Sequence, residues 1–186
     1  MEHRTEDELT AALPHLRDAP TDAGRIEMIV RRPAVDEREV LDAGELDPEV
    51  GLVGDSWQDR GSRRTDDGSS HPDMQLNVMS ARMVDLIAGS RERWALAGDQ
   101  LYVDLDLSAA NLPPGTLLHL GDEAVIEVTD QPHLGCAKFT RRFGLAAHRF
   151  VNSEIGKELH LRGINARVAV PGTIRSGDQI KVERPS

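Results

Sequence analysis

The feature that constrains the fold most is a strict alternation of apolar and polar residues. From Leu101 to Leu107 every second residue is Leu or Val, which is the period of a β-strand with one buried face. Two further apolar runs, residues 117–120 and 124–128, are joined by a turn that begins with Gly121-Asp122, as expected of a β-hairpin. The pattern predicts a mainly β fold.

The turn residues of this hairpin recur near the end of the chain. Pro114-Gly115-Thr116 followed by Gly121-Asp122 is repeated as Pro171-Gly172-Thr173 followed by Gly177-Asp178. Each Gly-Asp pair leads into an alternating strand, the second at residues 179–182. Two related hairpins are typical of a closed or half-closed sheet. We therefore predict an antiparallel β-barrel with two or three helices.

Helix ends are marked by capping residues. Thr5 and Glu8 have the spacing of a capping box at the start of a helix, which Pro14 should interrupt. Ser80 is an expected N-cap, and Gly89 is placed to end the helix that follows. Both helices are predicted to pack an apolar face against the core.

The first half of the chain contains the remaining elements. We assign residues 1–23 to an N-terminal helical extension and residues 24–186 to the barrel domain. Residues 56–75 are polar and rich in Gly and Ser, which predicts a long loop, either a mobile lid or a disordered segment. Residues 24–32 are expected to form a strand with three apolar side chains on one face: Ile26, Met28 and Val30.

Composition excludes several functional classes. The sequence has no run of about 18 apolar residues, and its N-terminal residues are too charged for a signal peptide. We therefore expect a cytoplasmic protein with no membrane contact. The formal net charge of −10 disfavours nucleic-acid binding. The single cysteine excludes an internal disulfide and a zinc site built on cysteine pairs.

Charge is distributed unevenly along the chain. Residues 1–130 contain 28 Asp and Glu against 12 Lys and Arg, whereas residues 131–177 contain two acids against eight bases. The window from Gln131 to Ser153 has no acid. It contains Cys136 together with Lys138, Arg141, Arg142, Arg149, His133 and His148. The window predicts either a basic surface patch or a site for an anionic ligand beside a thiol.

Several short motifs follow one another in order around this cysteine. They are Gly51-Leu52-Val53-Gly54-Asp55; Asn111-Leu112 with Gly115 and Gly121-Asp122; Val128-Thr129, Gly135-Cys136-Ala137-Lys138-Phe139 and Phe143-Gly144; and Leu161-Arg162-Gly163-Ile164, Arg167-Val168, Gly172, Ile174 and Gly177-Asp178. The similarity that these motifs carry covers roughly residues 24–183. The set is similar to the MOSC domain family, the module found at the C-terminus of molybdenum cofactor sulfurases, and the chain resembles a small stand-alone member.

The resemblance implies a β-barrel in which the cysteine lies on a loop after a long strand. In sulfurase relatives that cysteine is thought to carry or receive a persulfide sulfur, and in amidoxime-reducing relatives it is the molybdenum ligand. Cys136 takes this position here. The implied cofactor is the molybdenum cofactor (molybdopterin), and the family is also associated with pyridoxal phosphate. The implied partner is a separate cysteine desulfurase or electron-transfer protein, and one implied activity is the reduction of N-hydroxylated compounds.

The residue types near the cysteine suit this chemistry. A thiol acts as nucleophile, sulfur acceptor or metal ligand in its thiolate form, which neighbouring cations favour. Cys136 and His133 are therefore the candidate catalytic residues, with His133 as a proton donor. A pterin cofactor carries phosphate, which guanidinium groups bind well. The candidate cofactor-binding residues are Lys138, Arg141, Arg142, Arg162 and Asn111.

Structural roles are the alternative for the same residues. His133 could be a structural or surface residue, and Arg162 could stabilise a turn. Asn111 could satisfy backbone groups in a turn. Asp55 follows a glycine and is expected to be a turn residue. If Cys136 is only a packed side chain, the barrel is a non-catalytic module that binds a small anion or another protein.

Overall fold

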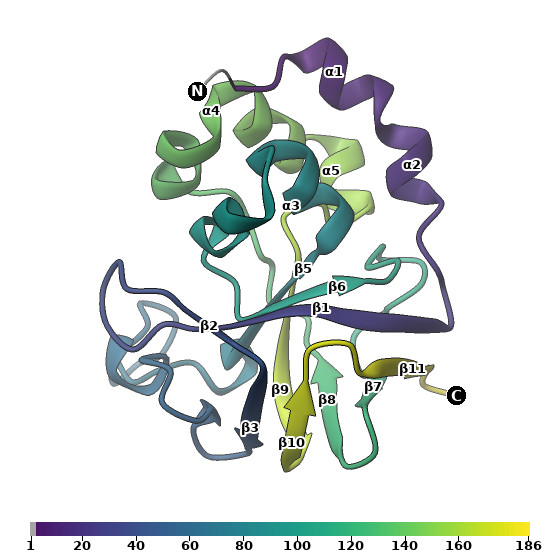
Figure 1. Cartoon of the computed structure of the whole chain (residues 1–186). Coiled ribbons are helices and arrows are strands. Elements are labelled where there is room, and N and C mark those ends of the chain that lie inside the picture. The colour runs from purple at the N-terminus through teal and green to yellow at the C-terminus, as the bar shows by residue number, and fades with distance from the viewer. Residues whose placement is uncertain (1–2) are drawn as a thin grey trace.

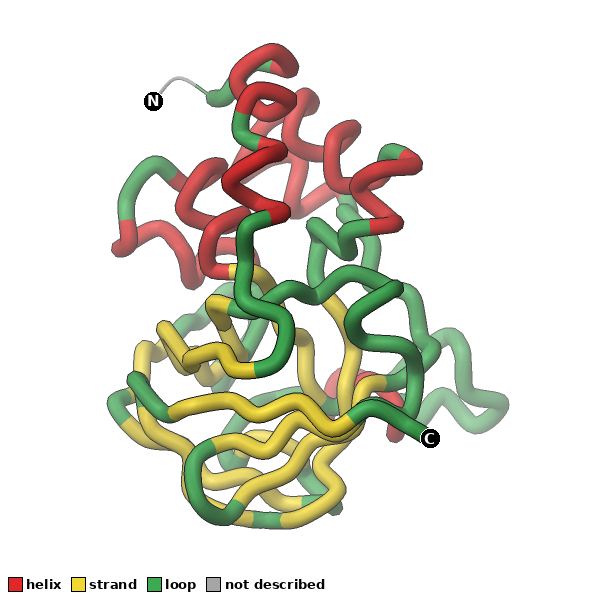
Figure 2. The backbone as a smooth tube through the Cα atoms, turned by 90° about the vertical axis from the view of Figure 1, so that its right-hand side faces the viewer, coloured by secondary structure: helices red, strands yellow, loops and turns green. Residues whose placement is uncertain are grey.

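A computed structural model describes residues 3–186 of the chain. Figure 1 shows the α-helices gathered at one end of the molecule and most strands at the other, and Figure 2 shows the same two layers from the side. The α-helices are α1 (Glu6–Ala11), α2 (Leu13–Arg17), α3 (Ala81–Ala88), α4 (Ala137–Asn152) and α5 (Glu154–Glu158). The 3-10 helices are η1 (Gln58–Arg60), η2 (Pro72–Met74) and η3 (Arg91–Ala97).

The strands form one closed sheet and one small open sheet. They are β1 (Ala23–Arg31), β2 (Glu39–Leu41), β3 (Ala43–Asp47), β4 (Gly51–Leu52), β5 (Leu76–Ser80), β6 (Leu101–Asp104), β7 (Leu117–Leu120), β8 (Ala124–Val128), β9 (Ile164–Val170), β10 (Gly172–Arg175) and β11 (Gln179–Glu183). The large sheet has the order β11-β7-β8-β9-β5-β6-β1-β2, and pairing of β11 with β1 closes it into a seven-stranded barrel. The small sheet has the order β10-β3-β4.

The barrel is mixed, so the prediction of an antiparallel barrel was correct only in part. Strands β5 and β6 pair in parallel, while the other neighbours in the barrel are antiparallel. The cause is the connection between β5 and β6, which runs through α3 and η3. Parallel neighbours need such a crossover, because a tight turn only joins antiparallel strands. The described residues also contain more helices than the two or three predicted.

Two apolar cores explain why β6 is buried on both faces. Leu101 and Val103 pack inside the barrel, whereas Tyr102 belongs to the core between the barrel and the helices. The predicted alternation of β6 is therefore confirmed: successive side chains point in turn into the barrel and into the core under the helices. The strand ends at Asp104, earlier than expected, although Leu105 and Leu107 still pack inside the barrel.

A β-bulge changes the faces of β1. The register against β6 shifts between Ile26 and Met28, and Ile26 lies in the barrel core with Ile29. Met28 and Val30 instead lie in the core under the helices. The prediction that Ile26 shares a face with Met28 and Val30 was therefore wrong, because one extra residue in a strand reverses the alternation beyond it.

The capping residues form the predicted helix ends. The Thr5 side chain accepts a hydrogen bond from the Glu8 backbone N–H, and the Glu8 carboxylate accepts one from the Thr5 backbone in return. Pro14 marks the break between α1 and α2. Ser80 caps α3, which ends at Gly89 in the left-handed conformation. No helix in residues 3–186 is sufficiently long and apolar to span a bilayer.

Only the first of the two predicted hairpins forms. Strands β7 and β8 pair across Gly121, as expected. Strand β10 pairs with β3, while β11 pairs with β7 and β1. The Gly177-Asp178 turn therefore connects β10, in the small sheet, to β11, in the barrel. The repeated motif precedes the strand that closes the barrel, and it does not form a second hairpin.

Candidate functional site

Cys136 lies directly before α4 and is its N-cap residue, with an extended backbone. The side chain is exposed and lines a cavity of about 290 Å³. Helix α4 is fixed by its apolar face, in which Phe139 and Phe143 are buried in the core under the helices. The amphipathic pattern of α4 therefore sets where the thiol lies.

We name this cavity the basic pocket because cations dominate its lining. It contains six basic side chains and one carboxylate, Asp36. The cations come from segments far apart in the sequence, and their convergence makes the pocket a site for an anion. The lining residues are Arg32, Val35, Asp36, Arg38, Arg60, Asn77, Ala97, Gly98, Cys136, Lys138, Phe139, Arg142 and Arg162.

Arg32 is held in the pocket wall by a buried carboxylate. Its Nε and Nη2 donate to the two oxygens of Asp55, each at 2.8 Å. Its Nη1 donates to Asn77 Oδ1 at 3.0 Å and to the Gly98 carbonyl at 2.8 Å. Asp55 is thus more than the turn residue expected from the Gly-Asp motif, because it neutralises an arginine that is itself buried.

A second buried carboxylate holds Arg162. Arg162 Nη1 lies 2.8 Å from both oxygens of Asp99, and Nη2 donates to the Ala97 carbonyl at 3.1 Å. Its Nε is buried and has no partner among the described residues. Asp99 also contacts His133 Nε2, at 2.7 Å. Burial alone would raise the pKa of Asp99, but Arg162 and His133 outweigh it and lower the pKa to about 2.

His133 is kept neutral by its surroundings. Burial lowers its pKa below the ordinary 6.5, and Arg162 lowers it further against the opposing effect of Asp99. The neutral ring donates through Nε2 to the Asp99 carboxylate, because a carboxylate only accepts. Asp99 therefore joins His133 to Arg162.

The depressed pKa of His133 predicts a fold that weakens on mild acidification. The unfolded chain binds a proton on this residue near pH 6.5, whereas the folded chain binds it only at lower pH. Its contribution to stability is therefore complete above about pH 6.5 and is lost as the pH falls, by up to about 1.4 kcal/mol per pH unit. Urea unfolding from about pH 8 to about pH 5 should show this slope. His133→Gln preserves a donor to Asp99 and should flatten it; an unchanged slope contradicts the assignment.

The remaining cations of the pocket repel one another. Burial lowers the pKa of Arg38, and Arg142 and Arg32 lower it further. Burial also lowers the pKa of Arg60, with Arg32 again adding to the effect. Both shifts mean that burial and the neighbouring cations outweigh the nearby carboxylates, Asp36 and Asp55. An anion bound between these side chains would offset the remaining repulsion.

The structure brings together some of the predicted site residues and separates others. Cys136, Lys138, Arg142 and Arg162 all line the basic pocket. Arg142 Nη2 donates to Asp36 at 2.9 Å, and Lys138 Nζ lies 3.5 Å from the same oxygen.

The other three candidates lie outside the basic pocket. Arg141 is exposed on α4. His133 lines a different cavity and reaches Arg162 only through Asp99. Asn111 donates to the Thr21 and Asp106 carbonyls and accepts from Arg184, which is the structural alternative considered for it.

Sequence reasoning missed half of the cations. Arg32, Arg38 and Arg60 line the pocket but belong to the acidic first part of the chain. The net negative charge of that part gave no indication of a basic site. One signal was present: Arg32 continues the face of β1 that carries Met28 and Val30. A charged residue on an otherwise buried face is rarely accidental, because an unpaired buried charge is costly.

Comparison with known proteins finds one matching family model and several solved structures with a similar fold. A family model described as MOSC domain matches residues 66–181. The YuaD protein from Bacillus subtilis is similar, with a TM-score of 0.67 and 16% identity, over 88% of this chain and 97% of that chain. YiiM from Escherichia coli is similar, with a TM-score of 0.55 and 22% identity, over 87% of this chain and 71% of that chain.

YiiM from Geobacillus stearothermophilus shows the same likeness, with a TM-score of 0.54 and 14% identity, over 87% of this chain and 75% of that chain. No curated protein gives a significant match. Likeness at these identities shows the fold. The family model spans more than half of the chain, and the chain therefore belongs to the MOSC domain family.

Proposed function

We propose that the basic pocket binds the molybdenum cofactor and that Cys136 is its thiolate ligand or carries sulfur for it. One observation carries the proposal: the only cysteine of the chain is exposed in a pocket with six cations and one carboxylate. The cofactor combines a phosphate with a metal that accepts soft sulfur ligands, and this donor set fits both parts. When bound, the cofactor supplies two-electron redox chemistry at its metal.

The free donors of the pocket indicate which residues would hold the phosphate. Arg60 uses only Nε, for Ser56, so that neither of its terminal nitrogens bonds to a described residue. Arg38 bonds through Nε to the Ala95 carbonyl and through Nη1 to the Glu37 carbonyl, which leaves Nη2. These two arginines, with Lys138, are better placed to clamp phosphate than Arg32 and Arg162, which are neutralised by Asp55 and Asp99.

Sulfur transfer to Cys136 needs only a persulfide donor, which a separate cysteine desulfurase would provide. The Cys136 thiolate attacks the terminal sulfur of the donor persulfide, so that a new S–S bond forms on Cys136. The S–S bond of the donor breaks, and the donor cysteine leaves as thiolate. The proton of the transferred sulfur stays with it, and no further oxidant is required.

The competing binding-only module requires an inert Cys136. A packed, inert cysteine is not favoured by the exposed position of Cys136. Binding of an anion without sulfur chemistry uses the same arginines. The two functions are therefore separated by tests on the thiol and not by tests on the cations.

The proposal is tested by loading the protein in both ways. The chain is expressed in a host that makes the cofactor, and bound molybdenum and pterin are measured. In parallel, the purified chain is mixed with a cysteine desulfurase and cysteine, and intact mass is measured for one added sulfur. Bound cofactor or a persulfide on Cys136 supports the proposal. Absence of both contradicts it.

Single arginine substitutions should separate the phosphate clamp from the surrounding surface. Arg60→Ala should weaken cofactor binding about ten- to a hundredfold, because one charge-assisted hydrogen bond contributes about 1.5–3 kcal/mol. Arg60→Lys should recover part of the affinity, since Lys has no planar fork. Arg141→Ala is the matched control, because Arg141 is exposed and lies outside the pocket. Calorimetric affinity and thermal stability are measured on all three; equal losses at positions 60 and 141 contradict the clamp.

A further inference from the structure

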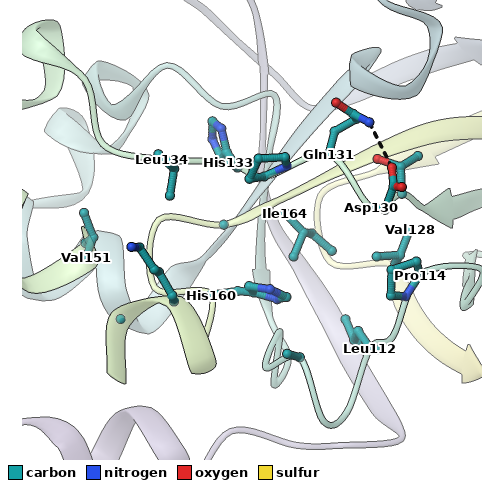
Figure 3. A pocket seen from close by; sticks show the side chains of 16 residues that line it. Leu112, Pro114, Val128, Asp130, Gln131, His133, Leu134, Val151, His160 and Ile164 are labelled. Carbon is teal, nitrogen blue, oxygen red and sulfur yellow. Dashed lines mark hydrogen bonds between the residues drawn. The ribbon is translucent and has the colours of Figure 1, made fainter. Parts of the chain in front are cut away.

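A second cavity, of about 460 Å³, is lined in part by residues 131–134, directly before the segment that carries Cys136. It shares no lining residue with the basic pocket. Most of its wall is aliphatic, and we name it the apolar cavity (Figure 3). The larger part of the aliphatic lining is Leu112, Pro114, Val128, Leu134, Val151 and Ile164, and Ala109 and Pro132 complete it. The volume is within the usual range for small-molecule sites.

One polar group is aimed into this apolar cavity. Figure 3 shows the imidazole of His160 pointing towards Leu112 and Ile164. Its Nδ1 lies 2.7 Å from the Leu107 carbonyl. Since a carbonyl only accepts, Nδ1 carries the proton, and Nε2 of the neutral ring is an acceptor. Nε2 makes no hydrogen bond with the residues that the structure describes.

The backbone at His160 is held in an unusual conformation that fixes this direction. Its φ is 46°, in the left-handed region that non-glycine residues seldom adopt. The Gly163 N–H donates to the His160 carbonyl at 2.7 Å and closes the turn. Strained residues of this kind persist where surrounding contacts determine them, and they are frequent at ligand sites.

The rest of the lining narrows the class of ligand. The charged side chains are Lys157 and Asp130, which balance each other. His133 is already engaged with Asp99. Thr129, Asp130 and Gln131 also line the cavity, but their side chains already bond to other residues. The interior thus offers aliphatic contact and the unpaired acceptor of His160, and it offers no excess of either charge.

We propose that the apolar cavity is a second ligand site, for a neutral small molecule with an apolar body and one N–H or O–H group that donates to His160 Nε2. Its lining is separate from that of the proposed cofactor pocket, so binding at either site can be tested alone. It adds a place for a substrate or effector beside the segment that carries Cys136, and it is linked to the basic pocket through the His133–Asp99–Arg162 contacts.

A matched pair of probes tests this site. Naphthol has an apolar body and one O–H, and its methyl ether has the same body without the donor. Calorimetric titration of the wild-type chain should show that naphthol binds about three- to tenfold more tightly, the value of one neutral hydrogen bond. His160→Asn tolerates the left-handed backbone and removes Nε2. It should reduce naphthol to the affinity of the ether and leave the ether unchanged.

Blocking the cavity provides a second, independent variant. Ala109 is exposed and lines the cavity, whereas Ala110 is exposed and does not. Ala109→Trp should abolish binding of both probes, while Ala110→Trp should retain it. No binding of naphthol to the wild type, equal affinity for the two probes, or full binding by Ala109→Trp overturns the proposal. Cys136→Ser should bind naphthol as the wild type does, so this site and the cofactor pocket succeed or fail separately.

Discussion

Replacing Asp99 with asparagine should destabilise the protein by about 3–5 kcal/mol, because the substitution leaves a buried arginine without its counter-charge. The Arg162 side chain is 7% exposed and Asp99 is fully buried. Both oxygens of Asp99 bind Arg162 Nη1, and one also contacts His133. Removing one member of such a group is far more costly than removing an exposed ion pair. Urea unfolding followed by circular dichroism measures the loss.

Asp36→Asn is the matched control for this substitution. Asp36 pairs with Lys138 and Arg142 in the basic pocket, but its side chain is 62% exposed. It has a φ of 62°, which asparagine tolerates. The control should therefore lose less than about 1 kcal/mol. If Asp99→Asn does not fold, the double variant Asp99→Asn/Arg162→Met should recover folding, since no unpaired charge remains. Equal effects at positions 99 and 36 contradict the role of the buried carboxylate.

The two buried carboxylates share a sequence pattern that only the structure explains. Asp55 and Asp99 each follow a glycine with positive φ, Gly54 and Gly98. In a sequence this dipeptide indicates a turn, because glycine adopts that backbone readily. Each turn instead delivers a carboxylate to a buried arginine, Arg32 or Arg162. The pairs are 23 and 63 residues apart, so the contacts depend on the tertiary fold and not on local sequence.

The barrel was predictable to the extent that strand faces follow local alternation. Leu101 and Val103 face the barrel interior as the pattern predicts. The bulge between Ile26 and Met28 was not predictable, because it leaves each residue type compatible with either face. The parallel pairing of β5 with β6 is a consequence of the crossover through α3. That helix was predicted from its capping residues, whereas the parallel pairing depends on β6 lying beside β5 in the sheet.

The candidate site was predictable where its residues are close in sequence. Cys136, Lys138 and Arg142 lie within two turns of one another, and the acid-free window revealed them. Arg38 and Arg60 lie in the acidic first part of the chain, so a count of charges along the sequence did not single them out. Arg141 was included because a count of charges does not distinguish the two sides of a helix, whereas the structure places Arg142 inward and Arg141 outward.

Replacing Cys136 with serine should abolish sulfur loading completely while leaving the fold and the phosphate clamp intact. The chain has one cysteine, so no other thiol can accept a persulfide. The side chain is exposed, and serine differs from it by one atom, so thermal stability should not change. Intact mass after exposure to a cysteine desulfurase should show one added sulfur on the wild type and none on the variant.

Cofactor binding to the same variant distinguishes the two roles proposed for the thiol. If Cys136 only carries sulfur, Cys136→Ser should bind the pterin with wild-type affinity, because Arg38, Arg60 and Lys138 remain. If Cys136 is the metal ligand, bound molybdenum should fall to background, since a serine hydroxyl is a hard ligand and is protonated near neutral pH. Arg60→Ala is the complementary variant. It should keep sulfur loading of Cys136 and lose affinity for the cofactor phosphate. Sulfur loading of Cys136→Ser contradicts the sulfur-carrier role. A wild-type molybdenum content in Cys136→Ser contradicts the metal-ligand role, and if the wild-type chain also forms no persulfide, both roles are contradicted.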